Sequence, residues 1–117
     1  MTRNNTGNSI KADLGDWNFG KGVENKFDAH VKKSVPGYEL SHYISLLLSD
    51  PFIKKNSNIL DLGCSTGTFS RKIYKRHKHK NPNILAIDNQ LNMIEKAKDL
   101  DSGANIKYKV MDLISDT

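Results

Sequence analysis

Residues 57–67, with the sequence SNILDLGCSTG, constrain the fold of this chain more than any other stretch. The apolar residues Ile59, Leu60 and Leu62 predict a short buried strand, and a glycine-rich turn follows it. The turn opens onto a segment with helical spacing. A strand, a glycine-rich turn and a helix in this order present backbone N–H groups to a nucleotide-like ligand. We therefore expect an α/β fold whose ligand binds at this turn.

The residues before this strand predict a polar arm and two helices. Residues 1–16 favour a flexible arm, and we expect order to begin near Trp17 and Phe19. The residues Val23, Phe27 and Val31 are spaced by four and predict a first helix. We interpret residues 17–56 as a helical approach segment and residues 57–117 as a cofactor-binding unit.

A break over residues 34–37 separates the two helices, because Pro36 disfavours the α conformation at Val35 and Gly37 permits a tight turn. The second helix is expected from Tyr38 to Leu48. Its apolar stripe consists of Leu40, Tyr43, Ile44, Leu47 and Leu48.

The residues after the turn predict a helix, a strand, a helix and a strand. The run from Ile84 to Ile87 is continuously apolar, which is typical of a parallel strand covered on both faces. We expect Asn89 to cap the next helix and Gly103 to end it. Residues 106–110 alternate apolar and lysine residues, as in a strand at a sheet edge. The apolar positions of the two helices are Phe69, Ile73, Leu91, Ile94 and Ala97.

A β-α-β-α-β unit with right-handed crossovers gives three parallel strands, and we expect the first strand to be innermost. The carboxyl ends of parallel strands meet at one edge of a sheet. The residues expected at this edge are 61–67, 88–89 and 111–112. An acidic residue lies at the end of each strand, which packing alone does not explain.

These acids suit an adenosine-type ligand. Asp88 lies where a carboxylate accepts both hydroxyls of a ribose, and Asp112 can accept from the exocyclic amine of an adenine. Asp61 can orient the loop or meet a cationic group of a ligand. Gly63 and Gly67 leave room for a ligand near the backbone. Each aspartate alone is better explained as a helix cap or a loop residue, and only the three together favour the ligand site.

Other motifs compete with this interpretation. The glycines form G-x-x-x-G, which is neither the full dinucleotide fingerprint nor a P-loop with its lysine. The same residues match the nucleophile elbow G-x-S-x-G around Ser65. A hydrolase also needs a histidine, and His77 and His79 follow in a basic helix that points away from the predicted site. A metal site at these two histidines lacks further ligands, so a solvated helix end is the simpler interpretation.

The net charge and the single cysteine indicate which partners and which cellular compartment to expect. The chain has 117 residues and a formal net charge of +5. A basic cluster fits a solvated helix face, and a phosphate-binding patch for RNA or DNA is the alternative. Its members are Arg71, Lys72, Lys75, Arg76, Lys78 and Lys80. Cys64 is the only cysteine, and the sequence has neither a long apolar run nor a signal peptide, so we expect a cytoplasmic protein without membrane contact.

The motifs together carry a resemblance to a known family. ILDLGCSTG followed by ILAIDN and a third strand ending in Asp resembles the first half of a class I S-adenosylmethionine-dependent methyltransferase. The segment FDAHVKKSVPGYELSHYISLL, ahead of DLGCSTG and AIDNQLNMIEKA, is similar to carboxy-S-adenosyl-L-methionine synthase. That family uses prephenate to carboxylate the cofactor for tRNA wobble-uridine modification. The resemblance spans about Trp17 to Asp112 and implies a Rossmann-like fold that binds S-adenosylmethionine or its carboxylated form.

The resemblance implies a role for several residues at the cofactor. Tyr38 would pack over it, and Gly63, Cys64 and Ser65 would line its amino-acid end. Asp88 would hold the ribose. Asn89 would lie beside the adenine, with Asp112 and Leu113 also at the base. No catalytic residue and no metal ligand is nominated.

The resemblance covers only the N-terminal half of the family's fold. Family members continue with four more strands, which carry the arginine that distinguishes the carboxylated cofactor. We expect either a fragment of a longer protein or a shortened form. An ordinary methyltransferase of RNA or a small molecule is the first alternative, and a non-catalytic binding module is the second. In a shortened form the open edge of the first strand would favour a homodimer.

Overall fold

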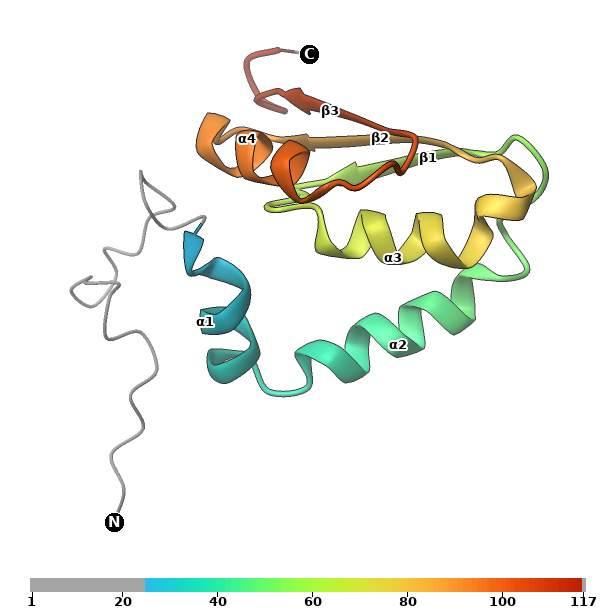
Figure 1. Ribbon diagram of the computed structural model, residues 1–117, viewed down its shortest axis with the longest axis horizontal. Helices are drawn as coiled ribbons and strands as arrows, with labels where there is room; N and C mark the ends of the chain where they lie inside the picture. Colours follow the sequence, from blue (N-terminus) through green and yellow to red (C-terminus); the bar gives the residue numbers. More distant parts are fainter. Residues whose placement is uncertain (1–24, 117) are drawn as a thin grey trace.

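The computed structural model describes residues 25–116, in the order of two helices followed by an alternation of strands and helices (Figure 1). The helices are α1 (Phe27–Ser34), α2 (Tyr38–Ser49), α3 (Thr68–His77), the 3₁₀ turn η2 (Lys78–Lys80) and α4 (Leu91–Leu100). The strands are β1 (Asn58–Leu62), β2 (Asn83–Asp88) and β3 (Ile106–Val110). The expected arm over residues 1–16, and the expected onset of order near Trp17, Phe19 and Val23, lie outside the described residues.

The three strands form one parallel sheet in the order β1-β2-β3. The parallel pairing and the place of β3 at an edge confirm the predictions. The expectation that the first strand is innermost is wrong within the described residues, where β2 is the middle strand. The reason is geometric: two right-handed crossovers in succession add each new strand on the same side of the sheet. One side of β1 is therefore left without a neighbour among residues 25–116.

The core lies on the sheet face that α3 and α4 cover. Ile59, Ile84 and Ile106 are register partners and form one row on this face. Ile84 packs with Ile73 of α3. In the next row Ala86 is fully buried and packs with Ile94 of α4. The expected apolar positions of β2 are thus largely confirmed.

The opposite face of the sheet is more open. Leu60 and Leu62 of β1 keep 56% and 55% of their surface exposed. The prediction that both are buried is wrong among the described residues, because α3 and α4 lie on the other face and β1 is an edge strand. Leu85 of β2 is half-buried on the same side as Leu60.

The break between the first two helices has the predicted conformation. Val35 is extended, with φ −108° and ψ 102°, and Gly37 has φ 73°, which glycine adopts without strain. The α2 helix then lies along α3 (Figure 1), and Leu46 packs against the core there.

The apolar stripe of α2 does not provide this packing. Its members are all exposed: Leu40, Tyr43, Ile44, Leu47 and Leu48. The side facing α3 instead uses Leu46 and the polar contacts of His42 and Ser49. Helical spacing locates an apolar face, but it does not identify the neighbour that the face meets.

The start of α4 also differs from the prediction. Gln90, not Asn89, is the residue before the helix, and no side-chain cap bond forms. The backbone N–H of Gln90 instead donates to Asp88 Oδ1, at 2.9 Å. Ile94 and Ala97 are buried as predicted, whereas Leu91 is 59% exposed. The helix ends at Leu100, three residues before Gly103, which has φ 95°.

Candidate functional site

The glycine-rich turn joins β1 to α3 through three residues with positive φ. These are Gly63 at 72°, Ser65 at 52° and Gly67 at 78°. The turn is tied to the neighbouring strand, since the N–H of Cys64 donates to the carbonyl of Ile87 at 2.8 Å. The N–H of Ser65 donates to Asp88 Oδ2 at 2.9 Å. The turn is thus held in place by the end of β2.

The two glycines of the turn have different surroundings. A side chain at Gly63 would meet no atom within 4 Å, so the backbone there borders open space. A side chain at Gly67 would lie 3.0 Å from both Arg71 Nη1 and Tyr108 Cε1. Gly63 therefore leaves space that a ligand can use, and Gly67 is required for packing at the start of α3.

Two cavities open on either side of Gly63. The helix-side pocket, of about 280 Å³, is lined by residues of α1, α2, β1 and the turn, including Tyr38, Asp61, Gly63, Cys64 and Ser65. The strand-end pocket, of about 340 Å³, is lined by the ends of β2 and β3, including Gly63, Asp88, Asn89, Asp112 and Leu113. The structure thus brings the predicted site residues together around Gly63, with the exception of Gly67, which lines neither pocket.

Asp61 and His42 both line the helix-side pocket. Asp61 Oδ2 accepts a hydrogen bond from Ser70 Oγ at 2.6 Å. Burial raises the pKa of Asp61, and the Ser70 hydrogen bond opposes this shift. His42 lies between the rings of Tyr38 and Phe69, with centroid distances of 4.3 and 5.0 Å.

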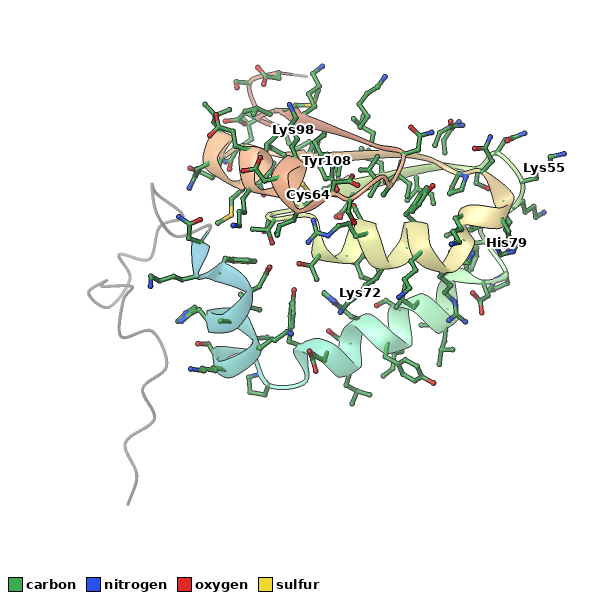
Figure 2. All side chains as sticks on the ribbon, in the orientation of Figure 1. Lys55, Cys64, Lys72, His79, Lys98 and Tyr108 are labelled. Atoms are coloured by element: carbon green, nitrogen blue, oxygen red, sulfur yellow. The ribbon has the colours of Figure 1, made fainter. Side chains whose placement is uncertain are left out.

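The contact with Lys72 indicates which ring nitrogen of His42 carries the proton. Lys72 lies between α3 and α2 (Figure 2), and its Nζ is 3.0 Å from His42 Nδ1. An ammonium can only donate, so His42 Nδ1 accepts and the neutral ring carries its proton on Nε2. Burial and the nearby Lys72 charge both lower the pKa of His42, which agrees with a neutral ring.

Cys64 lines the pocket without a nucleophilic role. Burial, with the charges of Asp61 and Asp88, raises the pKa of its thiol to about 12. A thiol reacts as the thiolate, so this side chain stays neutral and unreactive near pH 7.

Asp88 and Asp112 both bond to the backbone around them. Asp88 accepts from Ser65 N through Oδ2 and from Gln90 N through Oδ1. Asp112 Oδ1 accepts from the N–H of Ile114 at 2.8 Å and so caps the following turn. Each carboxylate oxygen has two lone pairs, so both residues can still accept hydrogen bonds from a ligand.

No sequence motif marks Asp28 or His42, and Lys72 was predicted only as a member of the basic cluster. Asp28 Oδ1 accepts from Thr66 Oγ1 at 2.7 Å and from Thr68 Oγ1 at 3.2 Å, which ties α1 to the turn. These residues lie on separate elements, and no spacing pattern within one element indicates such contacts.

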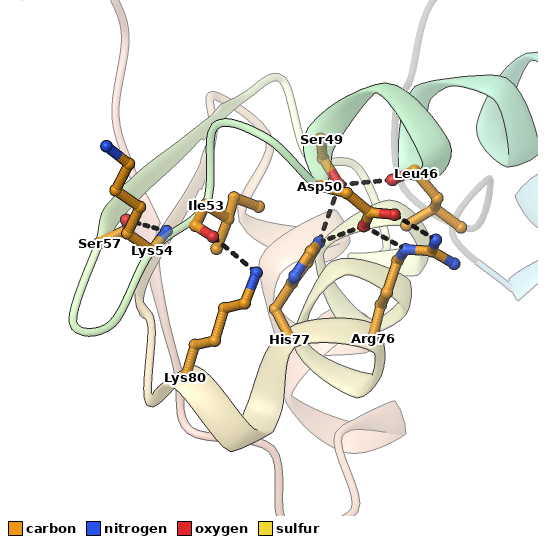
Figure 3. Close-up of polar contacts among 9 residues, drawn as sticks. All are labelled: Leu46, Ser49, Asp50, Ile53, Lys54, Ser57, Arg76, His77 and Lys80. Carbon is orange, nitrogen blue, oxygen red and sulfur yellow. Dashed lines mark hydrogen bonds and ion pairs between the residues drawn. The ribbon is translucent and has the colours of Figure 1, made fainter.

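The interpretation of His77 as part of a solvated helix end is wrong. Its side chain is 2% exposed, and Nε2 lies 2.8 Å from Ser49 Oγ and 3.6 Å from Asp50 Oδ1 (Figure 3). His77 lies at the far end of α3 from Ser65, so the Ser–His pairing that the hydrolase alternative needs is not formed. Among residues 25–116 no group of three His, Cys, Asp or Glu side chains could hold a metal ion.

The basic cluster is only partly a solvated face. Arg71 donates to the carbonyl of Thr66, and Arg76 pairs with Asp50 through two hydrogen bonds of 2.7 and 2.6 Å. Lys80 Nζ donates to the carbonyl of Ile53 at 2.8 Å (Figure 3). Lys75 and Lys78 are exposed. Half-buried Lys72 contacts His42, so most of the cluster joins α3 to its neighbours.

Part of the chain that forms this site matches a known protein family. Residues 59–116 match the methyltransferase domain family. This segment begins inside β1 and includes the turn and all three strand ends.

Curated relatives of this chain include carboxy-S-adenosyl-L-methionine synthases. The chain is 38% identical over 89 residues to the synthase of Citrobacter koseri and 37% identical to that of Salmonella heidelberg. Both alignments cover 74% of this chain and 35% of the relative. The chain therefore spans about a third of the length of the curated relatives it matches.

Solved structures confirm the class I methyltransferase fold. The plantazolicin methyltransferase BpumL, in complex with a triazolic desmethylPZN analog and SAH, matches with a TM-score of 0.59 and 19% identity. The match covers 83% of this chain and 37% of that one. A TehB-like methyltransferase from Corynebacterium glutamicum matches with a TM-score of 0.53 and 22% identity, covering 80% and 47%. No helix in the described part of the chain is long and apolar enough to span a bilayer.

Proposed function

We propose that this chain forms the cofactor-binding part of an S-adenosylmethionine-dependent transferase that resembles carboxy-S-adenosyl-L-methionine synthase. The observation that carries the proposal is the meeting of two pockets at Gly63. Three strand-end acids, Asp61, Asp88 and Asp112, surround this junction. The open space at Gly63 leaves room for a ligand to pass from one pocket to the other.

The strand-end pocket suits the adenosine part of the cofactor. Asp88 would accept the ribose hydroxyls while it keeps the turn in place. Asn89 would lie beside the adenine. Leu113 would pack on the base, and Asp112 would accept from its exocyclic amine.

The helix-side pocket suits the amino-acid part. The carboxylate of Asp61 would meet the ammonium group, and Gly63, Cys64 and Ser65 would line this end. Tyr38 would pack over the cofactor, since the turn at Gly37 places it on the pocket wall. The cofactor supplies the activated sulfonium carbon, and these residues bind and orient it.

The name of the curated relatives favours formation of a carboxylated S-adenosylmethionine. From the family resemblance we propose prephenate as the source of the carboxyl group and tRNA wobble-uridine modification as the use of the product. An ordinary methyltransferase is the alternative, because the family and the fold are common to both. We place the protein in the cytoplasm and take residues 17–56 as the approach segment and 57–117 as the cofactor-binding unit.

The test is a binding measurement followed by product analysis. The chain is titrated with S-adenosylmethionine, then incubated with prephenate, and the cofactor is analysed by mass spectrometry. Binding with a carboxylated product supports the synthase. Binding together with methyl transfer to another acceptor supports the ordinary methyltransferase. A folded chain that binds no cofactor contradicts both.

A second candidate, a binding module, rests on the open edge of β1. Leu60 and Leu62 are more than half exposed there. Two copies could pair their β1 strands through the backbone N–H and C=O groups of this edge and form a continuous sheet. Light scattering tests this homodimer, and a monomer at all concentrations contradicts it. The exposed residues Lys75 and Lys78 offer contact to RNA, which a salt-dependent binding assay tests.

A further inference from the structure

Asp28 connects α1 to the glycine-rich turn. Its Oδ1 accepts one hydrogen bond from Thr66 Oγ1, at 2.7 Å, and a longer one from Thr68 Oγ1, at 3.2 Å. The first contact joins residues 38 positions apart in the chain. Thr66 is 1% exposed, so the shorter of the two bonds is shielded from water.

Arg71 braces the same two threonines from α3. Its Nη1 donates to the backbone carbonyl of Thr66 at 2.6 Å, and Nη2 lies 3.5 Å from Thr68 Oγ1. The end of the turn is thus held between an acid of α1 and a base of α3. Opposite charges on the two sides of a short loop favour one conformation of that loop.

This tether sits beside the wall of the helix-side pocket. Phe27 and Thr66 both line the pocket, and Phe27 is the chain neighbour of Asp28. Burial raises the pKa of Tyr38, and the charge of Asp28 adds to this rise. Tyr38 also lines the pocket. The position of α1 therefore shapes the space next to Gly63.

We propose that Asp28 is a positioning residue that holds α1 against the glycine-rich turn and so closes the helix-side pocket over the amino-acid end of the cofactor. The proposal rests on the proposed function for the identity of the ligand. The tether itself is a property of the chain without ligand. The two parts can therefore be measured separately.

A matched control is available on the same helix. Lys32 of α1 pairs with Glu39 of α2 at 3.2 Å, with side chains 55% and 66% exposed. This ion pair links α1 to α2 without touching the turn. Exposed pairs of this kind contribute little to stability, so Glu39→Gln should leave the turn and the pocket unchanged.

The test compares the wild-type chain with Asp28→Ala, Asp28→Asn, Thr66→Val and Glu39→Gln. Hydrogen–deuterium exchange is measured without ligand, and SAH affinity is measured by equilibrium dialysis. We expect faster exchange in residues 27–34 and 64–68 for Asp28→Ala, with affinity about tenfold weaker. Asp28→Asn keeps an acceptor oxygen and should retain most of the affinity. Combining Asp28→Ala with Thr66→Val should add little to either single change.

The outcomes separate the two proposals. Unchanged exchange in both segments for Asp28→Ala overturns the tether, whether or not the chain binds SAH. Faster exchange with unchanged SAH affinity overturns its role at the pocket. A wild-type chain that does not bind SAH overturns the proposed function. The exchange data, which are measured without ligand, then test only whether Asp28 holds α1 against the turn. If Asp28→Ala does not fold, Thr66→Val provides the same exchange comparison, and Asp28→Asn is the variant that keeps the acceptor oxygen.

Discussion

The carboxylate of Asp88 and the backbone N–H of Ser65 form a 2.9 Å hydrogen bond across 23 residues of chain. This bond joins the end of β2 to the middle of the glycine-rich turn. The other oxygen of Asp88 accepts from the N–H of Gln90 at the start of α4. A residue predicted to bind a ribose therefore also organises the loop on which that ribose would lie.

Asp88→Asn should destabilise the chain even without ligand. Both oxygens of Asp88 accept from backbone N–H groups, so an amide must place its NH₂ group against one of these donors. We expect a loss of about 1–3 kcal/mol in the free energy of unfolding, measured by urea titration. Asp112→Asn is the control, because an amide oxygen can still accept from Ile114 N. Equal stability of Asp88→Asn and wild type would contradict the assigned geometry.

Gly67→Ala should be more damaging than Gly63→Ala. Both glycines have positive φ, which costs a non-glycine residue about 1–2 kcal/mol. At Gly67 the new Cβ would also lie 3.0 Å from Arg71 and Tyr108, whereas Gly63 borders open space. Thermal unfolding should show the larger drop for Gly67→Ala. Gly63→Ala should instead weaken cofactor binding more than its smaller loss of stability explains. A larger loss of stability for Gly63→Ala than for Gly67→Ala would contradict the surroundings described for the two glycines.

His77 should make stability depend on pH. Ser49 Oγ donates to the carbonyl of Leu46 at 2.6 Å, so it accepts from His77 Nε2–H, and the buried Nδ1 has no hydrogen-bond partner among the described residues. Burial, followed by the nearby charge of Lys80, lowers the pKa of His77. The unfolded chain then binds the proton more readily, and stability falls as pH decreases below about 6.5.

The measurement for His77 is the free energy of unfolding between pH 8 and pH 5. His77→Gln can still donate to Ser49 but does not titrate, so its stability should change less with pH than that of the wild type. His79→Gln is the control, since His79 is exposed on the same turn. A His77→Gln chain with the wild-type pH dependence would show that His77 does not titrate as described.

Cys64 should react slowly with thiol reagents. Its side chain is buried and burial raises its pKa to about 12, so the thiolate fraction at pH 8 is small. We expect the native chain to react with Ellman's reagent at least about a hundredfold more slowly than the chain in urea. Fast reaction of the native chain would mean that the turn opens readily or that the thiol is less buried than described.

The strands, the turn and the site at the strand ends could be predicted from local pattern. Apolar runs that end in Asp61 or Asp88 follow from the geometry of a parallel sheet, which brings the carboxyl ends together. Glycine at positions 63 and 67 follows from the positive φ values of the turn. These features depend on a few residues that are close in sequence.

The errors arose where distant elements meet. The apolar stripe of α2 predicted a helix, but it did not predict which neighbour that face of the helix meets. Likewise, the sequence around His77 did not indicate its hydrogen bond with Ser49 of α2. Asparagine often caps a helix, but here the backbone N–H of Gln90 donates to Asp88 and Asn89 is not the cap. Leu60 has the composition of a buried strand, and its exposure follows from its place at the edge. Tertiary contacts decide each of these cases.

The measurement that tests the central claim most directly is calorimetric titration of the chain with SAH, with Asp88→Ala as the comparison. The account predicts saturable binding at one site per chain and affinity at least about tenfold weaker for Asp88→Ala, because the ribose would lose a charged acceptor. Circular dichroism and cooperative unfolding establish that each chain is folded. A folded wild-type chain that releases no heat and retains no SAH in dialysis, or a variant with unchanged affinity, would contradict the account.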